Sequence, residues 1–153
     1  VGIVWSGSVT FKRNNFRAAD LAYFVANLNL PYVQLYSLQM GMKRDELAKY
    51  PNQIVPLDEL IKDFSDTSRI LDQLDLVIST CTSMVHLCGA LNKKCWVLLD
   101  YSPHWLWGTN GNSTNWYPSL TLFRQKIPGG WAEVFDHVQS ELLSETYKLG
   151  LLA

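Results

Sequence analysis

Residues 75–86, DLVISTCTSMVH, pass from a strand pattern to a helix pattern within three positions. Leu76-Val77-Ile78 is an apolar run between polar ends, which is typical of a strand buried on both faces. Thr82 and Ser83 follow with short side-chain oxygens that suit the cap of a helix, which we expect to end at Leu91. A buried strand that leads directly into a helix predicts a parallel sheet covered by helices.

The same alternation extends in both directions from this segment. Strand patterns lie at 1–6, 32–38, 53–55, 75–80, 94–99 and 120–124, and helix patterns at 18–28, 68–74, 83–91 and 131–149. We expect Asp66-Thr67-Ser68 to supply the N-cap and first turn of the second helix. From the last helix we expect Val134, Val138, Leu142 and Leu143 to face inward. The sequence therefore predicts an α/β fold, a Rossmann-like three-layer domain with a mostly parallel sheet of five or six strands.

The composition is that of one folded domain over residues 1–153. A hydrophobic content of 48% supplies a core and excludes a disordered chain. Thirteen Lys and Arg against fourteen Asp and Glu give no basic field, so we expect no nucleic-acid partner. No apolar run has the length of a membrane span. Cys81, Cys88 and Cys95 lack CxxC spacing and indicate reduced thiols, so we expect a cytoplasmic protein. Because Val1 lies inside an apolar run, we expect the chain to be a fragment of a longer one.

The carboxyl ends of the strands are where an open parallel sheet binds ligands. After the first strand, Ser6-Gly7-Ser8 lets a ligand approach the backbone, and Lys12, Arg13 and Arg17 follow. These cations suit a phosphate, although a solvated basic loop would look the same.

The helix that starts at Thr82 is the second candidate. The amides of Thr82, Ser83 and Met84 lie at its positive end, which favours a phosphate, and His86 lies one turn further on the same side. An ordinary capped helix with a core histidine remains the alternative. The rings of Trp105, Trp107 and Trp116 lie in a long loop, where they either stack on a base or sugar or pack against a neighbouring domain.

Several standard motifs are absent from the sequence. It has no GxGxxG, no GxxxxGK[ST], no Asp-x-Asp pair and no GxSxG. We therefore expect no metal and no other cofactor, and no hydrolase nucleophile is identified.

Blocks of the sequence resemble a known family in order along nearly the whole chain. Residues 63–67 (DFSDT) and 74–79 (LDLVIS) resemble the DFxDT and LDLVI blocks of bacterial glycosyltransferases. In these proteins tetratricopeptide repeats precede a GT-B catalytic region related to the heptosyltransferases. Residues 82–91 (TSMVHLCGAL) resemble the family's DTxxxHLAGAL, and residues 1–7 (VGIVWSG) its VGLVWAG. Shorter blocks follow at 96–99 (WVLL), 105–107 (WLW), 116–119 (WYPS), 122–125 (LFRQ) and 130–131.

The resemblance implies the carboxyl-terminal half of a GT-B fold, which binds the nucleotide-sugar donor of a metal-independent, inverting glycosyltransferase. It implies that an amino-terminal half-domain and repeats of the same polypeptide precede this chain and supply the general base, so no catalytic residue is assigned here. Expected donor-phosphate contacts are Ser6, Gly7, Lys12, Arg17, Thr82, Ser83, Met84 and His86. Expected nucleotide contacts are Gln39, Asp63, Phe64, Thr67 and Cys81.

The sequence departs from the family pattern in the loop after the first strand, which lacks the family's Asp and Arg-Ser pair, and at three later positions. Cys81 and His104 replace acidic residues, and Leu106 replaces an arginine between two tryptophans. Cys81 and Leu106 favour a second hypothesis, a non-catalytic interaction or scaffold module derived from a GT-B half. A third hypothesis, a sugar-nucleotide epimerase of the same architecture, fits the aromatic blocks less well.

Overall fold

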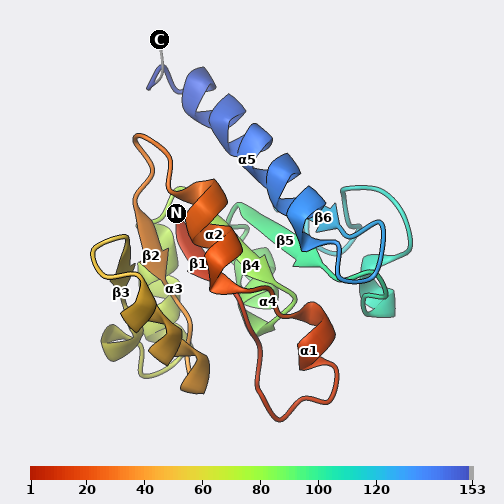
Figure 1. Ribbon diagram of the computed structural model, residues 1–153, viewed down its shortest axis with the longest axis horizontal. Coiled ribbons are helices and arrows are strands. Elements are labelled where there is room, and N and C mark those ends of the chain that lie inside the picture. Colours follow the sequence, from red (N-terminus) through yellow and green to blue (C-terminus); the bar gives the residue numbers. More distant parts are fainter. Residues whose placement is uncertain (152–153) are drawn as a thin grey trace.

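A computed structural model describes residues 1–151 of the chain. Its six strands form one sheet in the order β3-β2-β1-β4-β5-β6, and each strand runs parallel to its neighbours (Figure 1). The strands are β1 Gly2–Val4, β2 Leu35–Ser37, β3 Ile54–Pro56, β4 Val77–Thr80, β5 Cys95–Leu99 and β6 Leu120–Arg124. The predicted α/β class is confirmed, and this strand order is that of dinucleotide-binding domains.

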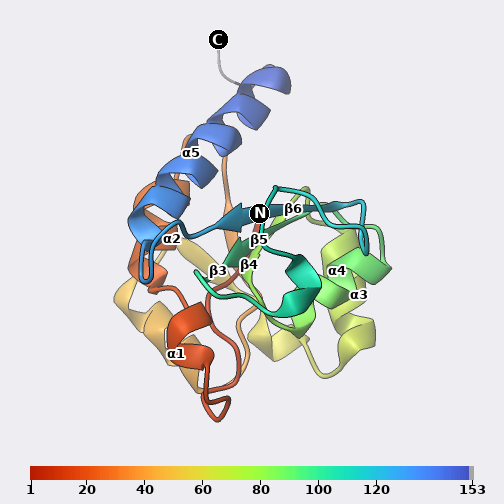
Figure 2. The same ribbon diagram turned by 90° about the vertical axis from the view of Figure 1, so that its right-hand side faces the viewer.

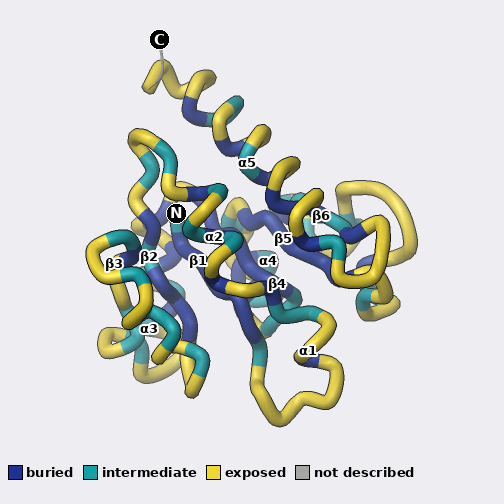
Figure 3. Tube along the Cα trace, viewed as in Figure 1, coloured by how far each residue is buried: buried dark blue, intermediate teal, exposed yellow. Residues whose placement is uncertain are grey.

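Helices cover both faces of the sheet, which gives three layers (Figure 2). The helices α2 (Leu21–Leu28) and α5 (Trp131–Lys148) pack on one face, and α3 (Phe64–Asp72) and α4 (Ser83–Ala90) on the other. Ile3 and Trp5 belong to the first core and Val4 to the second, because successive side chains of a strand point to opposite faces. Figure 3 shows the strands as the buried centre between exposed outer surfaces.

Four short helices lie in the loops between these elements: α1 (Asn14–Arg17), η1 (Met42–Lys49), η2 (Asp58–Leu60) and η3 (Trp105–Trp107). The helix pattern at 18–28 begins later than expected, since Ala18 is extended and Asp20 forms the N-cap of α2. The carboxylate of Asp20 accepts the N–H of Ala22 at 2.8 Å.

The predicted start of α3 was wrong. The helix begins at Phe64, and its N-cap is Asp63, whose Oδ1 accepts the N–H groups of Ser65 and Asp66 at 2.8 and 3.1 Å. Asp66 lies inside the first turn and accepts the N–H of Lys62 instead. Each of the two aspartates can cap a helix, and the earlier one adds a turn that buries Thr67.

The inward face of α5 was predicted correctly at Val134, Val138 and Leu142 but not at Leu143. Leu143 follows Leu142 by one position, which turns it about 100° around the helix axis and leaves it partly exposed. None of the helices in residues 1–151 is both long enough and apolar enough to cross a membrane.

The ring of Tyr117, in the loop between β5 and β6, packs closely against Gly89 of α4. A Cβ atom at Gly89 would lie 2.3 Å from Cγ of the tyrosine ring. We expect Gly89→Ala to lower the free energy of unfolding by about 1–3 kcal/mol, because the ring must move. Urea unfolding of the single variant measures this loss.

The same substitution in a Tyr117→Ala background is the matched control. Without the ring, Gly89→Ala should stabilise the protein by up to about 1 kcal/mol, as expected for alanine in a helix interior. Equal effects in both backgrounds would contradict the proposed contact.

Candidate functional site

The candidate site lies beyond the carboxyl ends of β1 and β4, which are neighbours in the sheet. Val4 pairs with Ser79, so the loops that follow the two strands start side by side. The chain connects β1 to β2 on one side, whereas β4 and the later strands lie on the other. Such a reversal of strand order is where doubly wound sheets open a crevice for ligands.

Two cavities flank a ridge at this position. The ridge is formed by Gly7 and Ser8 from the loop after β1 and by Thr82 and Ser83 at the start of α4, and these four residues line both cavities. We call the cavity over β2 and α3 the β2-side cavity and the one over β5 the β5-side cavity. Their volumes are about 670 and 790 Å³, which is within the range of small-molecule sites.

The predicted site residues divide between these cavities. Ser6, Gln39, Asp63, Phe64, Thr67 and Met84 line the β2-side cavity, and Arg17, Cys81 and His86 line the β5-side cavity. Gly7, Thr82 and Ser83 line both. Lys12 lines neither cavity and is exposed.

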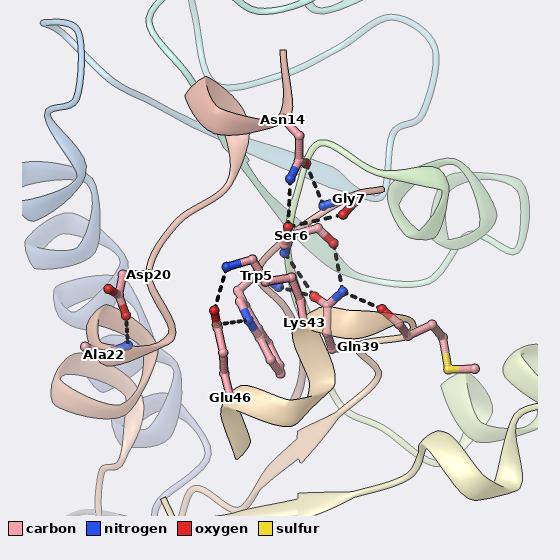
Figure 4. Close-up of polar contacts among 10 residues, drawn as sticks. Trp5, Ser6, Gly7, Asn14, Asp20, Ala22, Gln39, Lys43 and Glu46 are labelled. Carbon is pink, nitrogen blue, oxygen red and sulfur yellow. Dashed lines mark hydrogen bonds and ion pairs between the residues drawn. The ribbon is translucent and has the colours of Figure 1, made fainter. Parts of the chain in front are cut away.

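Gln39 holds the end of β1 in place (Figure 4). Its Oε1 accepts the N–H groups of Trp5 and Ser6 at 3.1 and 3.0 Å, and its Nε2 donates to the carbonyls of Ser6 and Met40 at 3.0 and 2.9 Å. The side chain is buried and all its usual hydrogen bonds are made within the protein. Gln39 therefore shapes the β2-side cavity, and direct contact with a nucleotide stays a prediction.

Asn14 closes the turn that follows. Its Oδ1 accepts the N–H of Gly7 at 3.0 Å, and its Nδ2 donates to Oγ of Ser6 at 3.0 Å (Figure 4). The N–H of Gly7 is thus already bonded within the protein. What Gly7 provides is space, because a Cβ atom there would lie 2.1 Å from the Arg17 guanidinium.

The cations of this loop differ in their partners. Arg13 pairs with the buried carboxylate of Asp100 at 3.1 Å. Arg17 lies over the ring of Phe11, with its Cζ 4.2 Å from the ring centroid, and in residues 1–151 it pairs with no carboxylate. Arg17 is therefore the cation of the loop whose charge is available to a ligand in the β5-side cavity.

The start of α4 keeps donors that face the ridge. Oγ1 of Thr82 accepts the N–H of Met84 at 3.3 Å, which caps the helix as predicted. The N–H of Ser83 donates to no group in the described part of the chain, and the residue is exposed. An exposed amide at the positive end of a helix attracts anions.

His86 lies one turn further, between two aromatic rings from the loop after β5. Its ring stacks on Trp107 with centroids 5.5 Å apart, and its Nδ1 is 3.2 Å from the hydroxyl of Tyr117. Burial lowers the pKa of His86 below its ordinary value, and the nearby His104 lowers that pKa further. A neutral ring is therefore favoured and can accept the hydroxyl proton at Nδ1.

Cys81 is a protonated thiol in the wall of the β5-side cavity. The indole N–H of Trp107 donates to its Sγ at 3.2 Å. Burial raises the pKa of Cys81, which outweighs the opposite effects of that hydrogen bond and of Arg17. Because the thiolate is the nucleophilic form of cysteine, this residue is unsuited to nucleophilic catalysis.

Asp63 and Thr67 make their hydrogen bonds within the first turn of α3. Oδ1 of Asp63 accepts two backbone N–H groups, and Oγ1 of Thr67 donates to the Asp63 carbonyl at 3.0 Å. Phe64 is exposed at the cavity edge together with Met40 and Met42. The β2-side cavity thus combines an apolar edge with polar side chains that are largely bonded within the protein, and Lys43 and Lys62 also belong to its lining.

Asp100 is a residue of the site that the sequence analysis did not identify. Its carboxylate lies directly after β5, is 8% exposed and borders the β5-side cavity. An acidic residue immediately after a buried strand was the available signal. Across residues 1–151, no three His, Cys, Asp or Glu side chains gather closely enough to hold a metal ion.

Comparison with protein-family models, with curated proteins and with solved structures finds no match to this chain.

The role of Gln39 can be tested by replacing its amide with an apolar group of similar size. We expect Gln39→Leu to lower the free energy of unfolding by about 2–5 kcal/mol, because two buried N–H groups and two carbonyls lose their partner. Chemical denaturation measures the change. Gln73→Leu is the control, because Gln73 is exposed and its side chain makes no hydrogen bond to another residue in 1–151; it should change stability by less than about 0.5 kcal/mol. A similar loss in both variants would contradict the role of Gln39.

The lowered pKa of His86 predicts a pH dependence of stability. On acidification the unfolded chain binds a proton at His86 before the folded chain does, so the folded state loses stability as the pH falls below about 6.5. The loss should level off below the folded-state pKa, and above pH 6.5 the residue should have no effect.

Denaturation of the wild type and of His86→Gln over a pH series, with NMR titration of the His86 ring, checks this expectation. The wild type should lose more stability on acidification than the variant. A ring pKa at or above the ordinary value, or a parallel pH profile in the two proteins, would refute it.

Proposed function

We propose that this chain is the donor-binding half of a metal-independent, inverting glycosyltransferase that uses a nucleotide-sugar. The observation that carries the proposal is the ridge between β1 and β4, which borders a cavity with the exposed apolar side chains of Met40, Met42 and Phe64 on one side and a cavity lined by Arg17 and the start of α4 on the other. A nucleoside diphosphate matches this arrangement, because it has a flat base at one end and charged phosphates at the other.

The phosphates are assigned to the ridge and its β5 side. Here the donors are the N–H and hydroxyl of Ser83, which make no hydrogen bond within residues 1–151, and the guanidinium of Arg17, which pairs with no carboxylate in that range. Charge-assisted hydrogen bonds from such groups are stronger than neutral ones. The base is assigned to the β2-side cavity, where Met40, Met42 and Phe64 offer apolar surface.

This arrangement supports departure of a nucleoside diphosphate without a metal. As an acceptor hydroxyl displaces the diphosphate from the anomeric carbon, negative charge grows on the leaving oxygen. Arg17 and the amino end of α4 are fixed close to the ridge and stabilise that charge. The general base and the acceptor site belong, in this proposal, to an amino-terminal half-domain preceded by repeats.

The three cysteines Cys81, Cys88 and Cys95 are free thiols, which supports the proposal of a cytoplasmic location.

A non-catalytic interaction module is the second candidate. Trp105 is 74% exposed and Trp116 is 59% exposed, and both lie in the loop between β5 and β6. Exposed aromatic rings of this kind are common at protein interfaces. Nucleotide binding discriminates between the two candidates.

Titration of the chain with UDP, GDP and ADP tests the proposal, with tryptophan fluorescence and melting temperature as readouts. Trp107 lines the β5-side cavity and should report a ligand there. We expect at least one nucleoside diphosphate to bind, and to do so equally well with Mg²⁺ or with EDTA. Absence of a response to all three at millimolar concentration would leave the interaction module as the better candidate.

The difference between Arg17 and Lys12 gives a sharper test. Arg17→Gln should weaken binding of the nucleotide about tenfold or more, because a charge-assisted contact to phosphate is lost. Lys12→Gln removes the same charge from an exposed side chain that lines neither cavity, and it should change the affinity by less than about threefold. Equal losses in the two variants would indicate long-range attraction by the loop in place of a contact from Arg17.

A further inference from the structure

We infer that a third cavity, at the ends of β5 and β6, binds a neutral sugar ring of the pyranose type. The cavity has a volume of about 400 Å³. Its lining includes Arg13, Phe16, Asp100, Tyr101, Gln125 and Trp131. It shares Arg13 and Asp100 with the β5-side cavity, so their ion pair separates the two spaces. Sugar binding in this cavity does not require nucleotide binding at the ridge.

Two buried polar side chains of this cavity have hydrogen-bonding groups without partners. Oε1 of Gln125 accepts the N–H groups of Tyr101 and Gly129 at 3.1 Å each, but its buried Nε2 donates to no group in the described part of the chain. Oδ2 of Asp100 accepts from Arg13, whereas no hydrogen bond within residues 1–151 ends on Oδ1. Native proteins pair nearly all buried polar groups, so the buried Nε2 of Gln125 indicates a polar ligand, and Oδ1 of Asp100 offers a second hydrogen-bonding group beside it.

The charges of the cavity favour a neutral ligand. Its two charged side chains, Arg13 and Asp100, neutralise each other, and Arg13 donates a further hydrogen bond to the carbonyl of Ser102 at 2.7 Å. A phosphate would lie next to the Asp100 carboxylate, and an ammonium group next to the Arg13 guanidinium. A hydroxyl group has neither penalty and both donates and accepts, so a polyhydroxylated ligand suits Oδ1 and Nε2 alike.

Aromatic side chains beside these polar groups indicate that the polyhydroxylated ligand is a sugar ring. Phe16 and Tyr101 are 64% and 56% exposed, and the more buried Trp131 is also part of the lining. A pyranose has an apolar face of C–H groups that packs on aromatic rings, while its hydroxyls point outward to polar side chains. A purely apolar ligand would leave Gln125 and Asp100 without partners.

NMR of the ¹⁵N-labelled chain tests the inference directly. The probes are the methyl β-glycosides of glucose, galactose, mannose and N-acetylglucosamine, and inorganic phosphate is the control ligand. We expect at least one glycoside to shift the side-chain amide signal of Gln125 and the backbone signal of Tyr101 saturably at millimolar concentration. Failure of all four glycosides, or saturation by phosphate, would overturn the inference.

Three variants locate the site. Asp100→Asn, which keeps the size of the side chain, and Tyr101→Ala, at an exposed position, should each weaken glycoside binding about fivefold or more. Tyr147→Ala removes a similarly exposed ring on the last turns of α5 and should leave the affinity unchanged. Tyr101→Ala leaves the core intact, so binding that is unaffected by this variant would refute the assignment.

The sugar can arrive as part of a free glycan or as part of the donor. If a UDP-sugar shifts the Gln125 side-chain signal and UDP alone does not, the cavity holds the donor sugar. If a methyl glycoside still shifts that signal in the presence of saturating UDP, the cavity binds a separate glycan. Nucleotide binding without any sugar-dependent shift would refute this inference and leave the proposed function standing.

Discussion

The parallel pairing of β1 with β4 is the contact on which the candidate site depends. The segments that follow β1 and β4 leave the sheet toward opposite faces, because α2 covers one face and α4 covers the other. No later strand fills the space between them, and backbone groups there lose their partners in the sheet. The backbone N–H groups after β1 find partners within the protein, but those after β4 do so only in part. Gln39 and Asn14 bond the amides of Ser6 and Gly7 on the β1 side, whereas the amide of Ser83 on the β4 side stays free. The β1 side of the crevice is therefore held by hydrogen bonds within the protein, whereas the β4 side offers the N–H of Ser83 to a ligand.

The pattern of neighbouring residues was enough to predict β4, the start of α4 and the cap between them. The segment 76–91 contains its strand, its cap and its helix in consecutive residues, and the structure confirms all three. The start of α3 was wrong because two aspartates three residues apart suit the same role, and only packing decides between them. Gln39 and Asp100 bond partners 33 and 87 positions away. The local pattern places Asp100 directly after a strand, but it does not indicate which distant residue either side chain bonds.

The basic loop shows how the fold separates residues that look alike in sequence. Lys12, Arg13 and Arg17 carry the same charge within six positions, yet they have different surroundings. Arg13 is neutralised by Asp100, Lys12 lies in solvent, and Arg17 lies on Phe11 with no acidic partner in the described chain. The near-zero net charge of the chain therefore does not describe the field at the ridge. A single unpaired guanidinium beside a helix start has more effect on an anion than the total charge.

The three cavities also differ in how their polar groups are used, and this difference bears on selectivity. In the β2-side cavity the amide of Gln39 and the side chains of Asp63 and Thr67 are bonded within the protein, so apart from the two lysines of the lining a ligand there gains mainly apolar contact. Apolar pockets discriminate weakly between ligands of similar shape, whereas unpaired buried polar groups reject any ligand that fails to bond them. In the lining of the three cavities, the buried group without a partner among residues 1–151 is Nε2 of Gln125, at the other end of the site, where the exposed amide of Ser83 and Oδ1 of Asp100 also make no hydrogen bond in this part of the chain. Selectivity should therefore arise beyond β4, β5 and β6, and the cavity over β2 should contribute affinity with little preference among bases.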